Sequence, residues 1–202
     1  MFLNVMCRRI INRAGLIYTM IDLRKRKLTP LPEEYKNPEL EGVLIPEREI
    51  RAIVKELANE LAKEGKNWHC IIILNGAVFF GADLLRQIEN CTFDTMQVIN
   101  INGKPDVKKP LSKELKDRDV LIIEDIIDSG QTMKFLIKHI RQQGAKSIKI
   151  ISFLSKPERR EFDVRLDYIG FIVPDKFLVG YGLDWNEKYR GLPFIASIRE
   201  DR

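Results

Sequence analysis

The residues best suited to chemistry are gathered at positions 124–132, where the sequence reads EDIIDSGQT. Glu124 and Asp125 carry acceptor oxygens of the kind that bind the two hydroxyls of a ribose. In the turn that follows, Gly130 lies between small polar residues, and the backbone N–H groups and hydroxyls there are suited to a phosphate. Asp128 remains available for proton transfer. The pattern therefore predicts a site for a phosphorylated sugar.

The flanking segments have the patterns of a buried strand and an amphipathic helix. Residues 120–123 form an unalternating apolar run, and the apolar residues after the turn recur with the period of a helix. The turn then lies at a helix N-terminus, where unpaired N–H groups favour an anion. We therefore expect the sugar phosphate to bind Asp128, Ser129, Gly130, Gln131 and Thr132. The alternative is that Asp128 and Ser129 only cap the helix and that the other two acids are solvated.

The motif resembles the 5-phosphoribosyl 1-diphosphate (PRPP) signature of the type I phosphoribosyltransferases. Residues 174–190, PDKFLVGYGLDWNEKYR, are similar to the purine-pocket segment of the hypoxanthine-guanine phosphoribosyltransferases within that family. With residues 154–156 and 74–85, the resemblance covers about residues 40–200. It implies a purine-salvage transferase in which hypoxanthine or guanine displaces diphosphate from PRPP, with Mg²⁺, to give IMP or GMP.

The resemblance also implies roles on the purine side of the site. Asp128 is the expected general base, Lys156 the donor to the 6-oxo group, and Phe177 the ring that stacks on the base. A backbone carbonyl near Leu178 would accept the 2-amino group of guanine. Because adenine presents an amino donor where Lys156 needs an acceptor, the lysine favours oxopurines.

On the diphosphate side, the resemblance implies contacts from Asn75, Gly76 and Arg190. Asp184, which also belongs to the purine-pocket segment, is the expected contact for hydrated Mg²⁺, with Glu124 and Asp125 as further metal candidates. Each residue also has a simpler interpretation when it is considered alone. Asp184 is typical of a turn and Phe177 of a hydrophobic core, and Lys156 and Arg190 are typical of a solvated surface.

Two features depart from the family pattern. Asn75 stands where the family commonly has a basic residue, at a loop that often contains a non-proline cis peptide, expected here between Asn75 and Gly76. Residues 102–110 form a shortened loop in place of a long lid with adjacent Ser and Tyr. One hypothesis is that Lys104, Lys108 or Lys109 supplies charge to the diphosphate; a solvated basic loop is the alternative.

Strand patterns near 71–74, 95–101, 119–123, 148–154, 167–173 and 177–181 alternate with helical patterns at 47–64, 77–89 and 132–143. The alternation predicts an α/β fold with a largely parallel central sheet flanked by helices. The resemblance adds a type I phosphoribosyltransferase-like fold with a small hood built from N- and C-terminal segments. Gly65 and Gly144 follow two of the helical patterns as C-terminal caps.

Composition fits one globular domain, with 45% hydrophobic and 31% charged residues among 202. We expect a phosphoribosyltransferase domain at 40–202 and a basic extension at 1–39, partly disordered or dispensable. Its arginine-rich start fits an organelle presequence, a peripheral extension, or a stretch upstream of a start at Met20. Three scattered cysteines favour a reducing, cytoplasmic setting, and no apolar run is long enough to span a bilayer.

The net charge of +5 raises nucleic acid as a partner. Much of the excess lies in the extension, and a polyanionic substrate also favours a positive field, so nucleic-acid binding is not expected. Two alternatives stay open: a phosphoribosyltransferase for xanthine or a pyrimidine, and an RNA-binding regulator that keeps the fold. By family resemblance we expect a homo-oligomer, a dimer or a tetramer.

Overall fold

The computed structural model describes residues 6–11 and 17–199. The helices are α1 (Glu47–Ala62), α2 (Val78–Leu85) and α3 (Gln131–Gln142), and two 3-10 turns lie at Glu33–Tyr35 and Pro157–Arg159. The strands are β1 (Met6–Ile11), β2 (Ile17–Asp22), β3 (Leu40–Ile45), β4 (Trp68–Leu74), β5 (Thr92–Ile101), β6 (Lys104–Lys109), β7 (Asp119–Ile127), β8 (Ser147–Ser155), β9 (Tyr168–Ile172), β10 (Leu178–Val179) and β11 (Ile195–Ile198).

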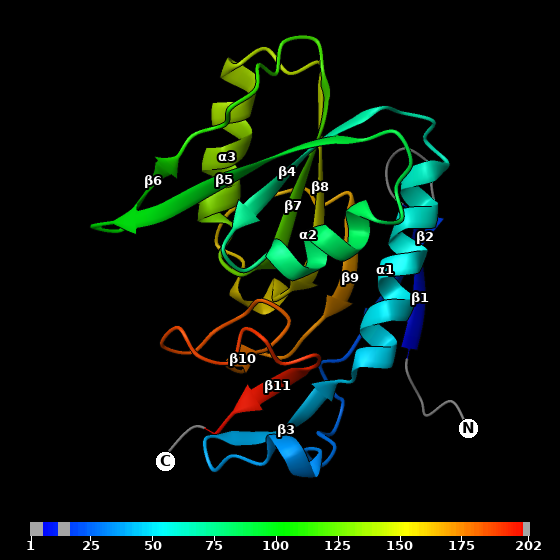
Figure 1. Cartoon of the computed structure of the whole chain (residues 1–202), viewed down its shortest axis with the longest axis vertical. Coiled ribbons are helices and arrows are strands. Elements are labelled where there is room, and N and C mark those ends of the chain that lie inside the picture. The colour runs from blue at the N-terminus through cyan, green and yellow to red at the C-terminus, as the bar shows by residue number, and fades with distance from the viewer. Residues whose placement is uncertain (1–5, 12–16, 200–202) are drawn as a thin grey trace.

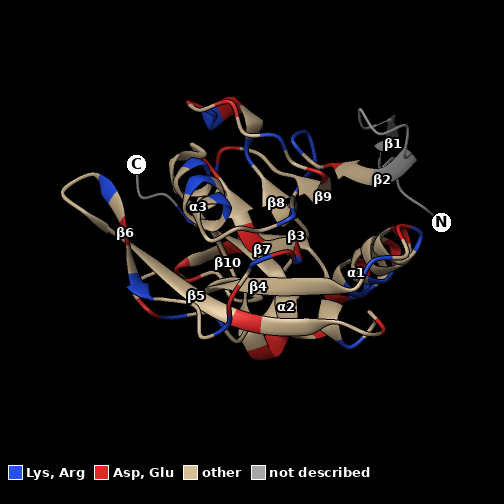
Figure 2. Ribbon diagram, turned by 90° about the horizontal axis from the view of Figure 1, so that it is seen from above, with Lys and Arg blue, Asp and Glu red and all other residues tan. Residues whose placement is uncertain are grey.

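A central sheet has the order β1-β2-β9-β8-β7-β4-β5-β6 in the described part of the chain. The pairs from β2 through β5 are parallel, and β1 and β6 are antiparallel edges. Helices α1 and α2 cover one face and α3 covers the other (Figures 1 and 2). The predicted α/β fold with a largely parallel sheet is therefore confirmed.

Burial on both faces explains the unalternating apolar strands. In β4, Ile72 packs into the cluster that includes α1 and α2, whereas Ile71 packs into the cluster that includes α3. In β7, Ile123 and Ile122 divide in the same way. Successive side chains of a strand point to opposite faces, so a strand covered on both sides needs apolar residues at every position.

A second, antiparallel sheet brings β3, from the first quarter of the chain, together with the C-terminal strands β10 and β11. Its order is β10-β11-β3, and it lies beyond the carboxyl ends of the central parallel strands (Figure 1). The strand predicted at 177–181 belongs to this sheet, as the short β10, and not to the central one. The hood predicted from N- and C-terminal segments is thus present.

Two parts of the sequence form strands that were not predicted. Residues 102–110, expected as a shortened loop, contain the turn Asn102-Gly103 and the strand β6, paired with β5 as a hairpin. Within the predicted extension, β2 pairs with β9, and Met20 is buried in the core. Residues 1–5 and 12–16 of the extension lie outside the described residues, and the boundary at residue 40 stays a prediction.

The predicted helix ends are confirmed at both glycines. Gly65 and Gly144 adopt φ of 60° and 81°, the left-handed conformation that glycine enters without a steric penalty. No helix in the described residues combines the length and apolar character needed to cross a membrane.

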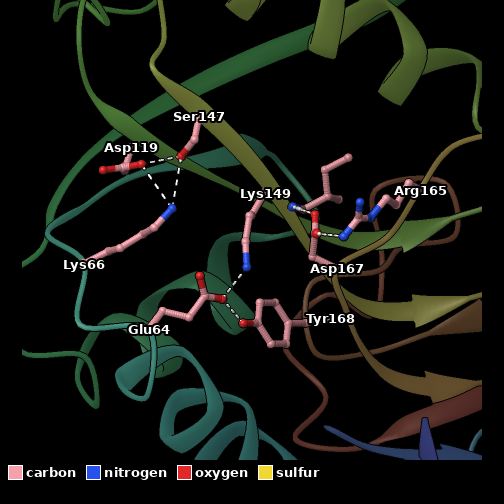
Figure 3. A network of polar contacts seen from close by, with 9 residues as sticks. Glu64, Lys66, Asp119, Ser147, Lys149, Arg165, Asp167 and Tyr168 are labelled. Atoms are coloured by element: carbon pink, nitrogen blue, oxygen red, sulfur yellow. Dashed lines mark hydrogen bonds and ion pairs between the residues drawn. The ribbon is translucent and has the colours of Figure 1, made fainter. Parts of the chain in front are cut away.

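A polar network lies at the amino ends of β7, β8 and β9 (Figure 3). Lys149 Nζ donates to Glu64 Oε1 at 2.6 Å, and the Tyr168 hydroxyl donates to the same oxygen. The side chains of Lys149 and Glu64 are only 16% and 7% exposed, so each needs its partner. The network joins the end of α1 to the sheet on the edge opposite the predicted site.

Replacing Lys149 with methionine should lower the free energy of unfolding by about 2–4 kcal/mol, because Glu64 would remain buried without its cation. Urea titration of wild type and variant measures the change. Lys36→Met is the matched control: Lys36 pairs with Glu33 at 2.5 Å, but the two side chains are 61% and 82% exposed, so the cost should stay below about 1 kcal/mol. Equal costs for the two variants would contradict a role for burial.

Candidate active site

The parallel strands bring the predicted site residues to one edge of the sheet. Asn75 follows β4, Asp128 follows β7 and Lys156 follows β8. Ile127 of β7 is paired with Ser155 of β8, so Asp128 and Lys156 are the first residues beyond two strands that end side by side. Ligands bind at the carboxyl ends of strands in open α/β sheets, and these side chains meet at that edge.

The turn before α3 encloses a cavity of about 130 Å³. Ser129, Gly130 and Thr132 line it, together with Glu124 and Asp128. Gly130 has φ of 87° and directly precedes the first residue of α3, so the turn presents the free N–H groups of a helix N-terminus. The size and the donors fit one phosphate group.

The alternative of a simple helix cap is not what the turn shows for Asp128. The N-cap residue of α3 is Gly130, which has no side chain that could cap the helix. The Asp128 carboxylate accepts a hydrogen bond from Arg159. Ser129 Oγ accepts from the Gln131 N–H at 3.3 Å. The Gln131 side chain turns away from the cavity and donates to the Gly103 carbonyl at 2.8 Å.

Glu124 and Asp125 lie within the last residues of β7 and not in a loop after it. Burial raises the pKa of Glu124 well above its ordinary value, and burial also raises the pKa of Asp125. Glu124 Oε2 is buried and has no hydrogen-bond partner among the described residues. A buried acceptor without a donor fits a ligand that brings its own, such as a sugar hydroxyl or metal-bound water.

Two glycines allow three backbone segments to stack beside Asp125. A Cβ at Gly76 would lie 1.7 Å from Asp125 Oδ2, and a Cβ at Gly182 would lie 1.9 Å from the Gly76 carbonyl oxygen. The cis peptide of this loop joins Leu74 to Asn75, one bond earlier than expected. Asn75 Oδ1 accepts from Gln97 of β5 at 3.5 Å.

Arg190 and Asp184 are already partners. Arg190 Nη2 lies 2.9 Å from Asp184 Oδ1, and its Nη1 donates to the Gly182 carbonyl at 2.8 Å. The positive charge of Arg190 also acts on Asp125. Arg190, predicted to bind the diphosphate, and Asp184, predicted to contact Mg²⁺, therefore both lie beside the Gly76 loop and form an ion pair with each other.

The residues predicted to bind the purine, here called the purine slot, combine exposed aromatic rings with a nearly buried cation. Phe177, 42% exposed, meets Trp185 edge to face with ring centroids 4.6 Å apart, and Leu178 continues into β10. Lys156 is 8% exposed, and its Nζ donates to the Lys176 carbonyl at 2.7 Å. Exposed aromatic rings beside a nearly buried lysine suit a flat heterocycle with an acceptor at its edge.

Sequence reasoning missed Arg159 and Asp175. Arg159 Nε donates to Asp128 Oδ1 at 2.7 Å, and its Nη1 lies 3.4 Å from Asp175 Oδ1. Both lie close to predicted site residues in the sequence, since Arg159 is three positions after Lys156 and Asp175 is two before Phe177. By type alone each resembles a solvated surface charge, so only the fold relates them to Asp128.

The β5–β6 hairpin reaches the site through its turn, because Gly103 accepts from Gln131. Lys109 Nζ donates to the Thr95 carbonyl at 2.6 Å and is thereby held at the base of the hairpin. Lys104 adjoins Gly103. The hypothesis of a lysine near the diphosphate therefore rests on Lys104 more than on Lys109.

A larger cavity, about 610 Å³, lies between α1, α2 and residues 191–193. It contains none of the predicted site residues. Because the unpartnered Glu124 oxygen and the phosphate-sized turn lie elsewhere, size alone does not make this cavity the active site.

Comparison with known proteins agrees with the geometry. The phosphoribosyl transferase domain family matches residues 45–186. The hypoxanthine-guanine phosphoribosyltransferase of Bacillus subtilis is 44% identical over 170 residues, which cover 80% of this chain and 94% of that protein.

Solved structures give the same result. A hypoxanthine-guanine phosphoribosyltransferase from Bacillus anthracis, with a HEPES molecule in its active site, has a TM-score of 0.78 at 39% identity and covers 80% of this chain and all (100%) of that one. A hypoxanthine-guanine-xanthine phosphoribosyltransferase has a TM-score of 0.76 at 34% identity and covers 81% of this chain and 100% of that one.

Proposed function

This chain belongs to the phosphoribosyltransferase family, and we propose that it transfers the 5-phosphoribosyl group of PRPP to hypoxanthine or guanine, giving IMP or GMP and diphosphate. The observation that carries the proposal is the placement, at the carboxyl ends of the parallel strands, of a phosphate-sized turn, a buried carboxylate oxygen without a partner, and exposed aromatic rings together with a nearly buried lysine. Purine salvage is the corresponding role.

Each residue contributes at a different part of the substrates. The turn 128–132 binds the 5′-phosphate, and Glu124 and Asp125 accept from the ribose hydroxyls. Asp128, beside both the sugar phosphate and the purine slot, accepts the ring proton as the base forms its bond to the anomeric carbon. Arg190 leaves Asp184 to meet the diphosphate, whose charge grows as it departs.

The donor set fits Mg²⁺ as a partner of the diphosphate. In the described residues no group of three or more His, Cys, Asp or Glu side chains is arranged to hold a metal. Mg²⁺ commonly binds through one or two carboxylates plus substrate phosphates and water. Asp184 would provide that carboxylate, with Glu124 and Asp125 close to the ribose. When bound, the ion would offset charge on the leaving diphosphate.

Replacing Lys156 with methionine should raise the KM for hypoxanthine and guanine by about 10- to 100-fold, the worth of a hydrogen bond to a charged group. The KM for PRPP should change little, and the kcat/KM preference for hypoxanthine over adenine should shrink. Steady-state kinetics with each base measure both effects. Lys55→Met, at an exposed position on α1, is the control; an unchanged purine KM in Lys156→Met would remove the lysine from base recognition.

The overall assignment is tested by offering the purified protein PRPP, Mg²⁺ and one base at a time, with diphosphate release as the readout. Turnover with hypoxanthine and guanine is expected. Turnover with xanthine or a pyrimidine alone would reassign the base, and no turnover with any base would remove the proposed activity. We further propose a cytoplasmic setting and a homo-oligomer, a dimer or tetramer. Light scattering of the same sample tests the oligomeric state.

A further inference from the structure

Four charges of alternating sign connect the two halves of the site. Asp128 is bonded to Arg159, Arg159 to Asp175, and Asp175 Oδ1 lies 3.6 Å from Lys156 Nζ. The first member belongs to the phosphate turn and the last to the purine slot. Because one guanidinium contacts both carboxylates, a change at either end alters the balance at Arg159.

The Arg159 contacts are open to exchange. The side chains of Asp128, Arg159 and Asp175 are 43%, 52% and 48% exposed. Pairs this exposed contribute little to stability, unlike the buried pair of Glu64 and Lys149. A ligand that enters the site and displaces water can therefore rearrange them.

The backbone around Arg159 is fixed to the turn that carries Asp128. The N–H groups of Glu161 and Phe162 donate to the Ser129 carbonyl at 3.0 and 3.1 Å. Arg160 Nη2 donates to Ser155 Oγ at 2.9 Å. These hydrogen bonds fix the main chain next to Arg159, so a rearrangement needs only its side chain to move.

We propose that Arg159 is a positioning residue that couples occupancy of the purine slot to release of Asp128. In the empty site Arg159 holds the Asp128 carboxylate, while Lys156 is occupied by Asp175 and the Lys176 carbonyl. When Lys156 turns to the purine oxygen, Asp175 keeps Arg159 as its nearest cation. Arg159 then shifts toward Asp175, which leaves Asp128 Oδ1 free to accept the ring proton. The guanidinium remains beside the carboxylate and keeps it oriented toward the purine, so loss of Arg159 costs this orientation.

This inference rests on the proposed function, so wild-type turnover is measured first. The test is a double-mutant cycle of Arg159→Gln and Asp175→Asn in the full chain, with kcat and the KM for PRPP as readouts. Arg159→Gln should lower kcat about tenfold and leave the KM for PRPP within about twofold, since positioning acts on the chemical step. Arg51→Gln, an exposed arginine paired with Glu47 on α1, is the matched control.

The cycle distinguishes coupling from a structural role. Asp175→Asn should lower kcat about fivefold in the native background but less than about twofold when Arg159 is already glutamine, because both act through one contact. Equal losses in the two backgrounds, or a kcat for Arg159→Gln within twofold of wild type, would overturn the inference. No wild-type turnover would instead remove the proposed function.

If Arg159→Gln does not fold, Arg159→Lys replaces it in the cycle. A lysine keeps the charge but not the planar fork that contacts two carboxylates, so kcat should fall about threefold and the effect of Asp175→Asn should shrink. An unchanged kcat together with an unchanged effect of Asp175→Asn would overturn the inference.

Discussion

Asp128→Asn should lower kcat by about 10²- to 10⁴-fold, the usual contribution of a positioned general base. Asparagine keeps the volume of the side chain, and its oxygen can still accept from Arg159 Nε, which lies 2.7 Å from Asp128 Oδ1. What the amide cannot do is take the purine ring proton. Steady-state kinetics with hypoxanthine and saturating PRPP measure the loss.

The KM for PRPP separates this chemical role from a binding role. Asp128 lines the phosphate-sized cavity, and a negative charge there opposes the phosphate, so its removal should leave the KM for PRPP unchanged or lower it. Asp163→Asn, at an exposed position before β9, should behave as wild type. A kcat for Asp128→Asn within threefold of wild type would assign the proton to another group.

The motif at 124–132 could be placed from sequence because its neighbours carry strong periodicities. The apolar run before it became β7 and the helical pattern after it became α3, each within a few residues. The strand extends to Ile127, however, so Glu124 and Asp125 are held by sheet pairing and not by a loop. Type and order of residues predicted the chemistry, but the degree of burial came only from the fold.

Other parts of the structure left no periodic signal. In β6 only Val107 is a large apolar residue, and the strand exists because its backbone pairs with β5. Arg159 is related to Asp128 through the register that sets Ile127 beside Ser155, which depends on the whole parallel sheet. Contacts of this kind join residues far apart in the chain, so a local pattern cannot predict them.

Gly76→Ala should be strongly damaging although it adds only one carbon. Its Cβ would lie 1.7 Å from Asp125 Oδ2 and 2.5 Å from the Asp125 carboxyl carbon, distances that force the loop or the acid to move. The loop cannot move away from Asp125 toward Gly182, because the Gly182 backbone already packs closely against the Gly76 carbonyl. Shifts near 1 Å in a reacting group cost about 10²-fold in rate, and overpacking adds about 1–3 kcal/mol of instability.

Activity and stability should therefore both fall in Gly76→Ala, with kcat/KM for PRPP reduced by about 10²-fold or more because the ribose and diphosphate contacts shift together. Gly65→Ala is the contrasting variant: Gly65 has φ of 60° but nothing within 4 Å of an added Cβ. It should lose about 1 kcal/mol of stability from the left-handed backbone and keep full kcat/KM. Urea titration and kinetics on both variants test this. An equal kcat/KM in Gly76→Ala and Gly65→Ala would mean that a methyl group is tolerated as well beside Asp125 as far from it. The close approach of the loop to Asp125 would then be irrelevant to substrate binding.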